Sequence, residues 1–213
     1  MTLNYVRCAP ALLFCAANFS AVPVVAGESS TQISTHLTTQ VTAVVLPQGR
    51  YSQVALREMG REASHILKQS GVSLRWRVGV PAQSVSGMLV VVKLLGRCEM
   101  DGSPAFLQPG PLGWSHEVDG TVLPFSDLAC DKLRAAVVSA MADGNQFGAN
   151  VLLGRAMGRV LAHELYHIVA GTSVHGHDGV AQAAFTPRQL TSGPLELEAP
   201  EVAAVQNGIG RMR

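Results

Sequence analysis

The fold of this 213-residue chain is decided by the stretch Met157-Gly158-Arg159-Val160-Leu161-Ala162-His163-Glu164-Leu165-Tyr166-His167-Ile168-Val169-Ala170-Gly171-Thr172-Ser173-Val174-His175. It contains the pattern His-Glu-x-x-His at positions 163 to 167. Residues four apart on an α-helix lie one above the other on the same face, so His163 and His167 can point their imidazoles at one metal ion. Glu164 directly follows His163, which sets it beside the metal, where it can take a proton from a water bound to the metal.

The residues around this pattern predict a largely buried helix. Its apolar positions are Val151, Leu152, Met157, Val160, Leu161 and Ile168. Gly171 follows as a C-terminal cap would. Four of the seven histidines fall at positions 163, 167, 175 and 177. The alternative is a helix with two histidines in ordinary hydrogen bonds, and we favour the metal interpretation because the histidines cluster.

The segment resembles the active-site helix of the zincin metallopeptidases. In that superfamily the two histidines bind zinc and the glutamate is the general base and acid, so the resemblance implies these roles for His163, His167 and Glu164. It also implies an α+β fold, a zincin-like catalytic domain in which a mixed or antiparallel sheet is backed by helices, including the active-site helix. A catalytic zinc site has three protein ligands and one water, so a third ligand is needed.

The residues after the helix resemble two zincin subfamilies. Metzincins continue as His-x-x-Gly-x-x-His, and here Gly171 and His175 keep that order with each gap one residue longer. Aspzincins carry Gly-Thr-x-x-Asp, and residues 171–175 match that layout with His175 in place of Asp. The Met-turn of metzincins is not evident, since Met212 is the only later methionine. We predict His175 as the third ligand.

Other residues compete for this third position. His177 and Asp178 lie close by in the sequence. A ligand arrangement like that of the gluzincins would use a carboxylate further on, from Glu196, Glu198 or Glu201. We expect Pro200 to prevent one long helix there, and we favour solvated surface charges for these acids.

The first 26 residues read as a secretory signal peptide. Arg7 is their one basic residue, residues 9–17 form an apolar run, and Val24-Val25-Ala26 offers small residues before a cleavage site near Ala26-Gly27. A retained apolar anchor is less favoured, because polar residues and a proline interrupt the run. We therefore expect one mature domain, 27–213, outside the cytoplasm. In that oxidising compartment Cys98 and Cys130 are predicted to form a disulfide, the alternative being two buried thiols.

Local patterns predict the other elements of this domain. They are strands at 41–46, 72–78 and 88–95, a hairpin of 112–117 and 121–125 around Asp119-Gly120, helices at 53–69 and 127–140, and a short helix after Thr186. Ser52 is the expected cap of the first helix, and Ser126 or Asp127 that of the second. In the zincins that this chain resembles, an edge strand pairs with an extended substrate by β-augmentation, and the resemblance makes the hairpin from Trp114 to Phe125 the candidate edge. The last residues give no clear element.

Composition agrees with a folded domain that has a sizeable core. Apolar residues make up 47% and charged residues 15%, which argues against disorder, and the net charge of +1 indicates neither nucleic acid nor an anionic membrane as partner. The resemblance to the zincins, together with the signal-like N-terminus, implies a secreted or periplasmic metalloendopeptidase with Zn²⁺ as cofactor, acting on peptide or protein and not stably inserted in a membrane after signal cleavage. The alternatives are a non-catalytic zinc-binding module and a zinc amidase acting on cell-wall peptide.

Overall fold

A computed structural model describes residues 38–80, 84–141 and 148–211. The predicted signal peptide, 1–26, lies outside the described residues. In chain order the elements are β1 (Thr39–Pro47), α1 (Gln53–Lys68), β2 (Val72–Val78), β3 (Met88–Leu95), β4 (Gly113–Val118), β5 (Thr121–Ala129), α2 (Cys130–Ala140), α3 (Ala149–Ala170), the 3₁₀ turn η2 (Gly179–Ala181), α4 (Pro187–Thr191) and α5 (Ala199–Arg211).

The strands form one mixed sheet in the order β2-β1-β3-β5-β4. β1 pairs in parallel with both β2 and β3, and β3 pairs in parallel with β5. The hairpin partner β4 pairs antiparallel with β5 and ends the sheet. The predicted hairpin around Asp119-Gly120 and its place at the edge are therefore confirmed, and so is the α+β class with a mixed sheet.

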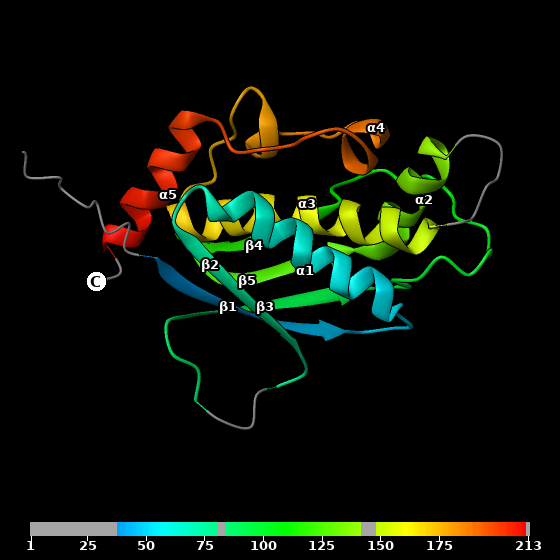
Figure 1. The fold of residues 1–213 in the computed structure, drawn as a ribbon, viewed down its shortest axis with the longest axis horizontal. Coiled ribbons are helices and arrows are strands. Elements are labelled where there is room, and N and C mark those ends of the chain that lie inside the picture. Colours follow the sequence, from blue (N-terminus) through cyan, green and yellow to red (C-terminus); the bar gives the residue numbers. More distant parts are fainter. Residues whose placement is uncertain (1–37, 81–83, 142–147, 212–213) are drawn as a thin grey trace, which may run out of the picture. The chain divides into compact units, whose positions relative to one another are not determined.

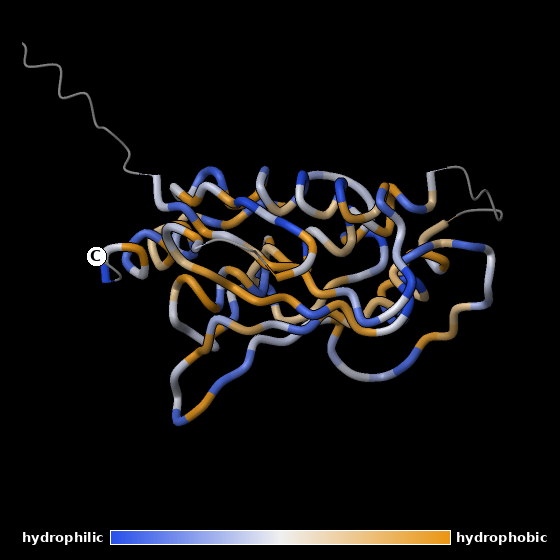
Figure 2. The backbone as a smooth tube through the Cα atoms, turned by 90° about the horizontal axis from the view of Figure 1, so that it is seen from below, coloured by the Kyte–Doolittle hydropathy of each residue, from blue (hydrophilic) through white to orange (hydrophobic). Residues whose placement is uncertain are grey.

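Helices α1 and α3 lie side by side over one face of this sheet (Figure 1). Two glycines of α3 allow the close approach: a Cβ at Gly154 would lie 2.4 Å from the carbonyl oxygen of Ala55, and one at Gly158 would lie 2.7 Å from that of Met59. The apolar core fills the space between helices and sheet. Figure 2 shows long hydrophobic stretches along the tube in the middle of the view. This packing fixes α3, which carries the metal-binding pattern, over the sheet.

Most predicted elements match in place, but α2 begins later than expected. Ser52 caps α1 by accepting a hydrogen bond from the amide of Ala55, as predicted. Ser126 and Asp127 do not cap α2, because both belong to β5 and pair with residues of β3. The helix starts at Cys130, after Ala129 as its N-cap residue, without a side-chain cap. A cap-like sequence is here overridden by strand pairing.

The C-terminal helix α5 was not predicted from the sequence. Pro200 lies in its first turn, where a missing backbone N–H costs nothing, so the proline starts the helix rather than breaking it. Gly208 lets α5 sit against the end of α3, and Arg211 donates a 2.7 Å hydrogen bond to the carbonyl oxygen of Ala170. The helix therefore braces the C-terminal end of α3.

The predicted disulfide between Cys98 and Cys130 is present. It joins the loop after β3 to the first residue of α2, across 32 residues of sequence. No helix in the described ranges has both the length and the apolar character needed to cross a membrane.

Candidate metal centre

Helix α3 carries the His-Glu-x-x-His residues, and its Glu164 lies beside β4 at the edge of the sheet. It runs from Ala149 to Ala170 and is buried over most of its length. Gly171 ends it in the left-handed conformation, with φ of 62°, as predicted. The chain then turns back, and this turn returns His175 to the face of the helix that carries His163 and His167.

The two helix histidines face each other with unprotonated nitrogens. Each Nδ1 is 2.7 Å from a backbone carbonyl oxygen, that of Val180 for His163 and that of Thr172 for His167. Because a carbonyl only accepts, each Nδ1 carries the proton and each Nε2 keeps its lone pair. The two Nε2 atoms are 3.0 Å apart. Two acceptors at that distance repel each other unless a cation lies between them.

His175 completes a group of three imidazoles. One ring nitrogen from each of His163, His167 and His175 lies within 4.8 Å of the others, a group that can hold a metal ion. The ring of His175 is exposed, whereas those of the helix histidines are buried. Within the described part of the chain this is the one group of its kind. This group does not contain the other candidates for the third ligand, which are His177, Asp178, Glu196, Glu198 and Glu201.

Burial tunes the titratable groups of this site. It lowers the pKa of His163 to about 4, and it also lowers the pKa of His167. Both imidazoles are therefore neutral at pH 7, the form that binds a metal. Burial raises the pKa of Glu164 to about 7, partly opposed by hydrogen bonds from Ser115, whose Oγ lies 2.7 Å from Glu164 Oε2. A carboxyl group with that pKa can both accept and release a proton near neutrality.

The edge strand β4 passes directly beside Glu164. A Cβ at Gly113 would lie 2.6 Å from Cγ1 of Val160 and 3.1 Å from Oε1 of Glu164, so only glycine allows the strand to approach this closely. On its outer side, β4 has no strand partner among the described residues. That side is where an added strand can pair with β4.

A cavity of about 600 Å³ adjoins the three histidines. Its walls come from β4, α2, α3 and the segment 183–190. Phe185 stands edge-on to His163, with 5.7 Å between ring centroids. Leu112, Val160 and Leu190 are among its apolar lining residues. The site thus combines a metal-ligand group, a buried carboxyl group and a largely apolar pocket.

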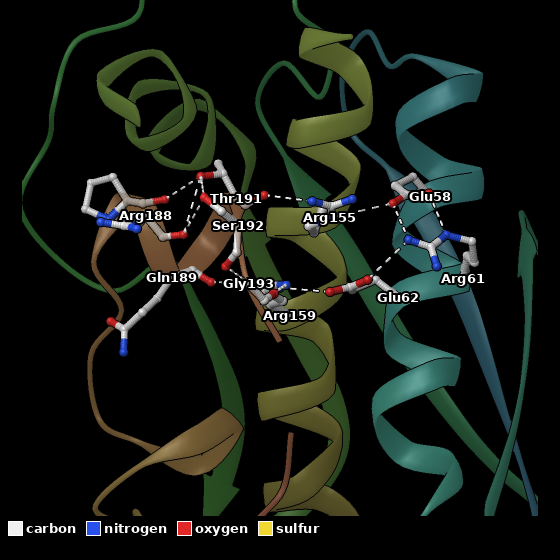
Figure 3. A network of polar contacts seen from close by, with 11 residues as sticks. Glu58, Arg61, Glu62, Arg155, Arg159, Arg188, Gln189, Thr191, Ser192 and Gly193 are labelled. Atoms are coloured by element: carbon white, nitrogen blue, oxygen red, sulfur yellow. Dashed lines mark hydrogen bonds and ion pairs between the residues drawn. The ribbon is translucent and has the colours of Figure 1, made fainter. Parts of the chain in front are cut away.

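A buried arginine holds the cavity wall in place (Figure 3). Arg159, one turn before His163, forms a 2.8 Å ion pair from Nε to Oε1 of Glu62 on α1. Its two terminal nitrogens donate to the carbonyl oxygens of Gln189, Ser192 and Gly193. Gln189 belongs to α4, and Ser192 and Gly193 follow directly after it. Pro187 and Leu190 of the same helix line the cavity. No local pattern in the sequence marks this role of Arg159, because Glu62 lies 97 residues away in the chain.

Two other polar side chains near the site have local partners. His116 on β4 is 2.9 Å from Asp127 Oδ2 and is not among the cavity-lining residues. Tyr166 donates a 3.2 Å hydrogen bond to the carbonyl oxygen of Val174, which steadies the turn before His175. Ser115, which contacts Glu164, was missed, since a serine in a predicted strand carries no signal of that contact.

Comparisons with known proteins add one structural similarity. No protein-family model matches the chain, and no curated protein matches it. Among solved structures it is similar to the crystal structure of archaemetzincin from Methanopyrus kandleri, at 11% sequence identity and a TM-score of 0.47. The similarity covers 84% of this chain and 99% of that chain.

Proposed function

We propose that this chain is a zinc-dependent metallopeptidase that hydrolyses internal peptide bonds of an extended peptide or protein. The observation that carries the proposal is the pair of Nε2 atoms of His163 and His167, 3.0 Å apart with both Nδ1 atoms already engaged. Beside them lies Glu164, a buried carboxyl group whose raised pKa suits proton transfer. A site that only binds metal has no need of such a group.

The donor set fits zinc. Three imidazoles, two of them with tautomers fixed by backbone carbonyls, form one of the ligand sets of catalytic zinc sites, which keep a fourth position for water or substrate. We assign these ligand positions to His163, His167 and His175. A zinc ion held there lowers the pKa of a bound water and polarises the carbonyl of the bond to be cleaved.

The protein's own groups then position the substrate and move the proton. The open edge of β4 pairs with the extended peptide backbone and sets the bond to be cleaved beside the metal centre. Glu164 accepts a proton from the attacking water and transfers it to the leaving amine. Ser115 holds one oxygen of Glu164 and leaves the other free for this transfer. The apolar cavity receives a side chain next to the cleaved bond.

Two alternative functions use the same residues. A non-catalytic zinc-binding module would keep the three histidines but gain nothing from the buried Glu164. A zinc amidase acting on cell-wall peptide would share the whole mechanism and differ in substrate. Digestion of an unfolded protein and of cell-wall peptide by the same preparation separates the peptidase from the amidase.

The proposed place of action is outside the cytoplasm. It is supported by the signal-like composition of residues 1–26, and by the disulfide between Cys98 and Cys130, which such a compartment favours. N-terminal sequencing of the exported protein tests it, with a first residue near Gly27 as the expected result. An intact N-terminus would contradict cleavage.

Metal stoichiometry is the first experiment. Mass spectrometry of the wild type is expected to show one zinc per chain, lost in His175→Ala and kept in the matched control His177→Ala. Zinc kept in His175→Ala and lost in His177→Ala would move the third ligand. A wild type that takes up no zinc when incubated with it would contradict the proposed function.

A further inference from the structure

The cavity beside the metal centre contains one feature that hydrolysis itself does not require. Lys132, in the first turn of α2, is the one lysine or arginine among the described residues that line it. Apolar side chains such as Leu112, Val160 and Leu190 form much of the same wall. The side chain of Lys132 is half-buried there, and a cation with apolar groups on one side attracts an opposite charge more strongly than a fully solvated one.

The ammonium group of Lys132 is held in place but is not neutralised. It donates a 3.3 Å hydrogen bond to the carbonyl oxygen of Pro111, although an ammonium has three donors. It forms no ion pair with any carboxylate of the described residues. Gly110 makes room for it, because a Cβ there would lie 2.7 Å from Nζ. The turn at Gly110 and Pro111 therefore leaves space for the ammonium group and binds it through one carbonyl oxygen.

The ammonium group of Lys132 contacts the chain just before the residue that lies beside Glu164, where the proposed function places the cleaved bond. Pro111 precedes Gly113 by two residues, and a Cβ at Gly113 would lie 3.1 Å from Oε1 of Glu164. Two residues of chain span at most about 7 Å. A substrate residue beside the cleaved bond can therefore reach the ammonium of Lys132. Glu117 and Glu164 are the acidic residues among the described residues that line the cavity, and their charge disfavours an anion away from Lys132.

We propose that Lys132 makes this cavity selective for a carboxylate on the substrate, next to the cleaved bond. The carboxylate is either the side chain of a glutamate or aspartate, or the free C-terminal carboxyl group of a short peptide. This inference rests on the proposed peptidase function and names its substrate class. Lys132 is thus a specificity-determining residue, and its apolar surroundings accommodate the stem that carries the carboxylate.

Matched peptide pairs test the proposal on the zinc-loaded protein. One set exchanges glutamate for glutamine at each position of an unstructured peptide, and the other compares free with amidated C-termini. The wild type is expected to favour the carboxylate member in kcat/KM by about tenfold or more, as for a charge-assisted hydrogen bond. The first set reports a side-chain carboxylate and the second a terminal one.

Variants assign this preference to one residue. Lys132→Met is expected to reduce the ratio within each pair to about one, and Lys132→Arg to retain most of it, because arginine keeps the charge. Lys93→Met is the matched control, since Lys93 is exposed on β3 and does not line the cavity. Equal cleavage of both members by the wild type, or a preference that survives in Lys132→Met, would overturn the proposal.

A second readout separates this proposal from the proposed function. If the wild type cleaves no peptide, the peptidase function has failed, and binding of the same pairs to the zinc-loaded Glu164→Gln protein is measured by calorimetry. Tighter binding of the carboxylate member, lost when Lys132→Met is added, supports the role of Lys132. Equal binding of both members overturns it.

Discussion

Two buried polar clusters lie one turn apart on α3, and they differ in how completely they are satisfied. Around Arg159, the positive charge meets Glu62 and the terminal nitrogens meet three carbonyl oxygens. Around His163 and His167, only the Nδ1 atoms have partners, and the two Nε2 atoms face each other. Since buried polar groups in folded proteins are normally paired, the arginine cluster is complete, whereas the two Nε2 lone pairs of the histidine cluster can take a metal ion as their partner. The first cluster supports the fold, and the second is a group that can hold a metal.

The largest effect expected from this contrast is on turnover. Glu164→Gln removes the proton acceptor beside the histidines, and general acid–base catalysis contributes about 10²- to 10⁴-fold. We expect kcat to fall by that factor while one zinc per chain is retained, as measured by peptide cleavage and metal analysis of the same preparation. Glu198→Gln, an exposed glutamate outside the histidine group, is the control and keeps full activity. Turnover that persists in Glu164→Gln would reject the catalytic role.

Breaking the arginine cluster is expected to act on stability instead. Arg159→Met leaves Glu62 buried without its partner, which costs about 3–5 kcal/mol of unfolding free energy. Urea denaturation measures this loss, and metal analysis is expected to show that folded Arg159→Met still binds one zinc. Adding Glu62→Gln recovers part of the stability, because the unpaired buried charge is gone. Arg57→Met, at an exposed position on α1, is the control, with a change within about 0.5 kcal/mol. A loss of zinc without a loss of stability would reverse the assignment of the two clusters.

Metal removal tests the incomplete cluster directly. A ligand present at a thousand times its dissociation constant stabilises the folded protein by about 4 kcal/mol. For a domain of this size that corresponds to roughly 10 °C in Tm. We expect a chelator to lower the Tm of the wild type by about this amount and to leave that of His167→Ala almost unchanged. Equal shifts in both proteins would show that the stabilising zinc binds elsewhere.

Structural features that depend on neighbouring residues in the chain were predicted correctly from the sequence. The helical period around His163, the cap at Ser52 and the Asp119-Gly120 turn each depend on residues within a few positions, and each prediction is confirmed. The predicted cap of α2 at Ser126 or Asp127 is wrong, because both residues pair with β3 as part of β5. Pro200 misled the prediction of α5, because a proline breaks a helix only beyond its first turn.

The missed parts of the site depend on contacts far apart in sequence. Ser115 meets Glu164 across 49 residues, and Glu62 meets Arg159 across 97. No local pattern marks either pair. The three histidines were found because the helix sets two of them four residues apart and the turn at Gly171 returns the third. A metal site built on one helix and its following turn is therefore predictable, whereas the groups that orient it are not.

The smallest expected effect concerns the pH dependence of stability from the histidine cluster. In the metal-free protein, burial lowers the pKa of His163 from 6.5 to about 4, so between these pH values the unfolded chain binds a proton that the folded chain does not. Stability from this group is present above pH 6.5 and is lost as the pH falls toward 4, by up to about 3 kcal/mol. Burial of Glu164 acts in the opposite sense between pH 4.5 and 7, because its folded pKa is raised to about 7. The measurement therefore uses metal-free Glu164→Gln, with urea denaturation from pH 7 to 4. Adding His163→Ala is expected to reduce the slope but not to abolish it, because burial also lowers the pKa of His167. An unchanged slope would show that His163 does not cause it.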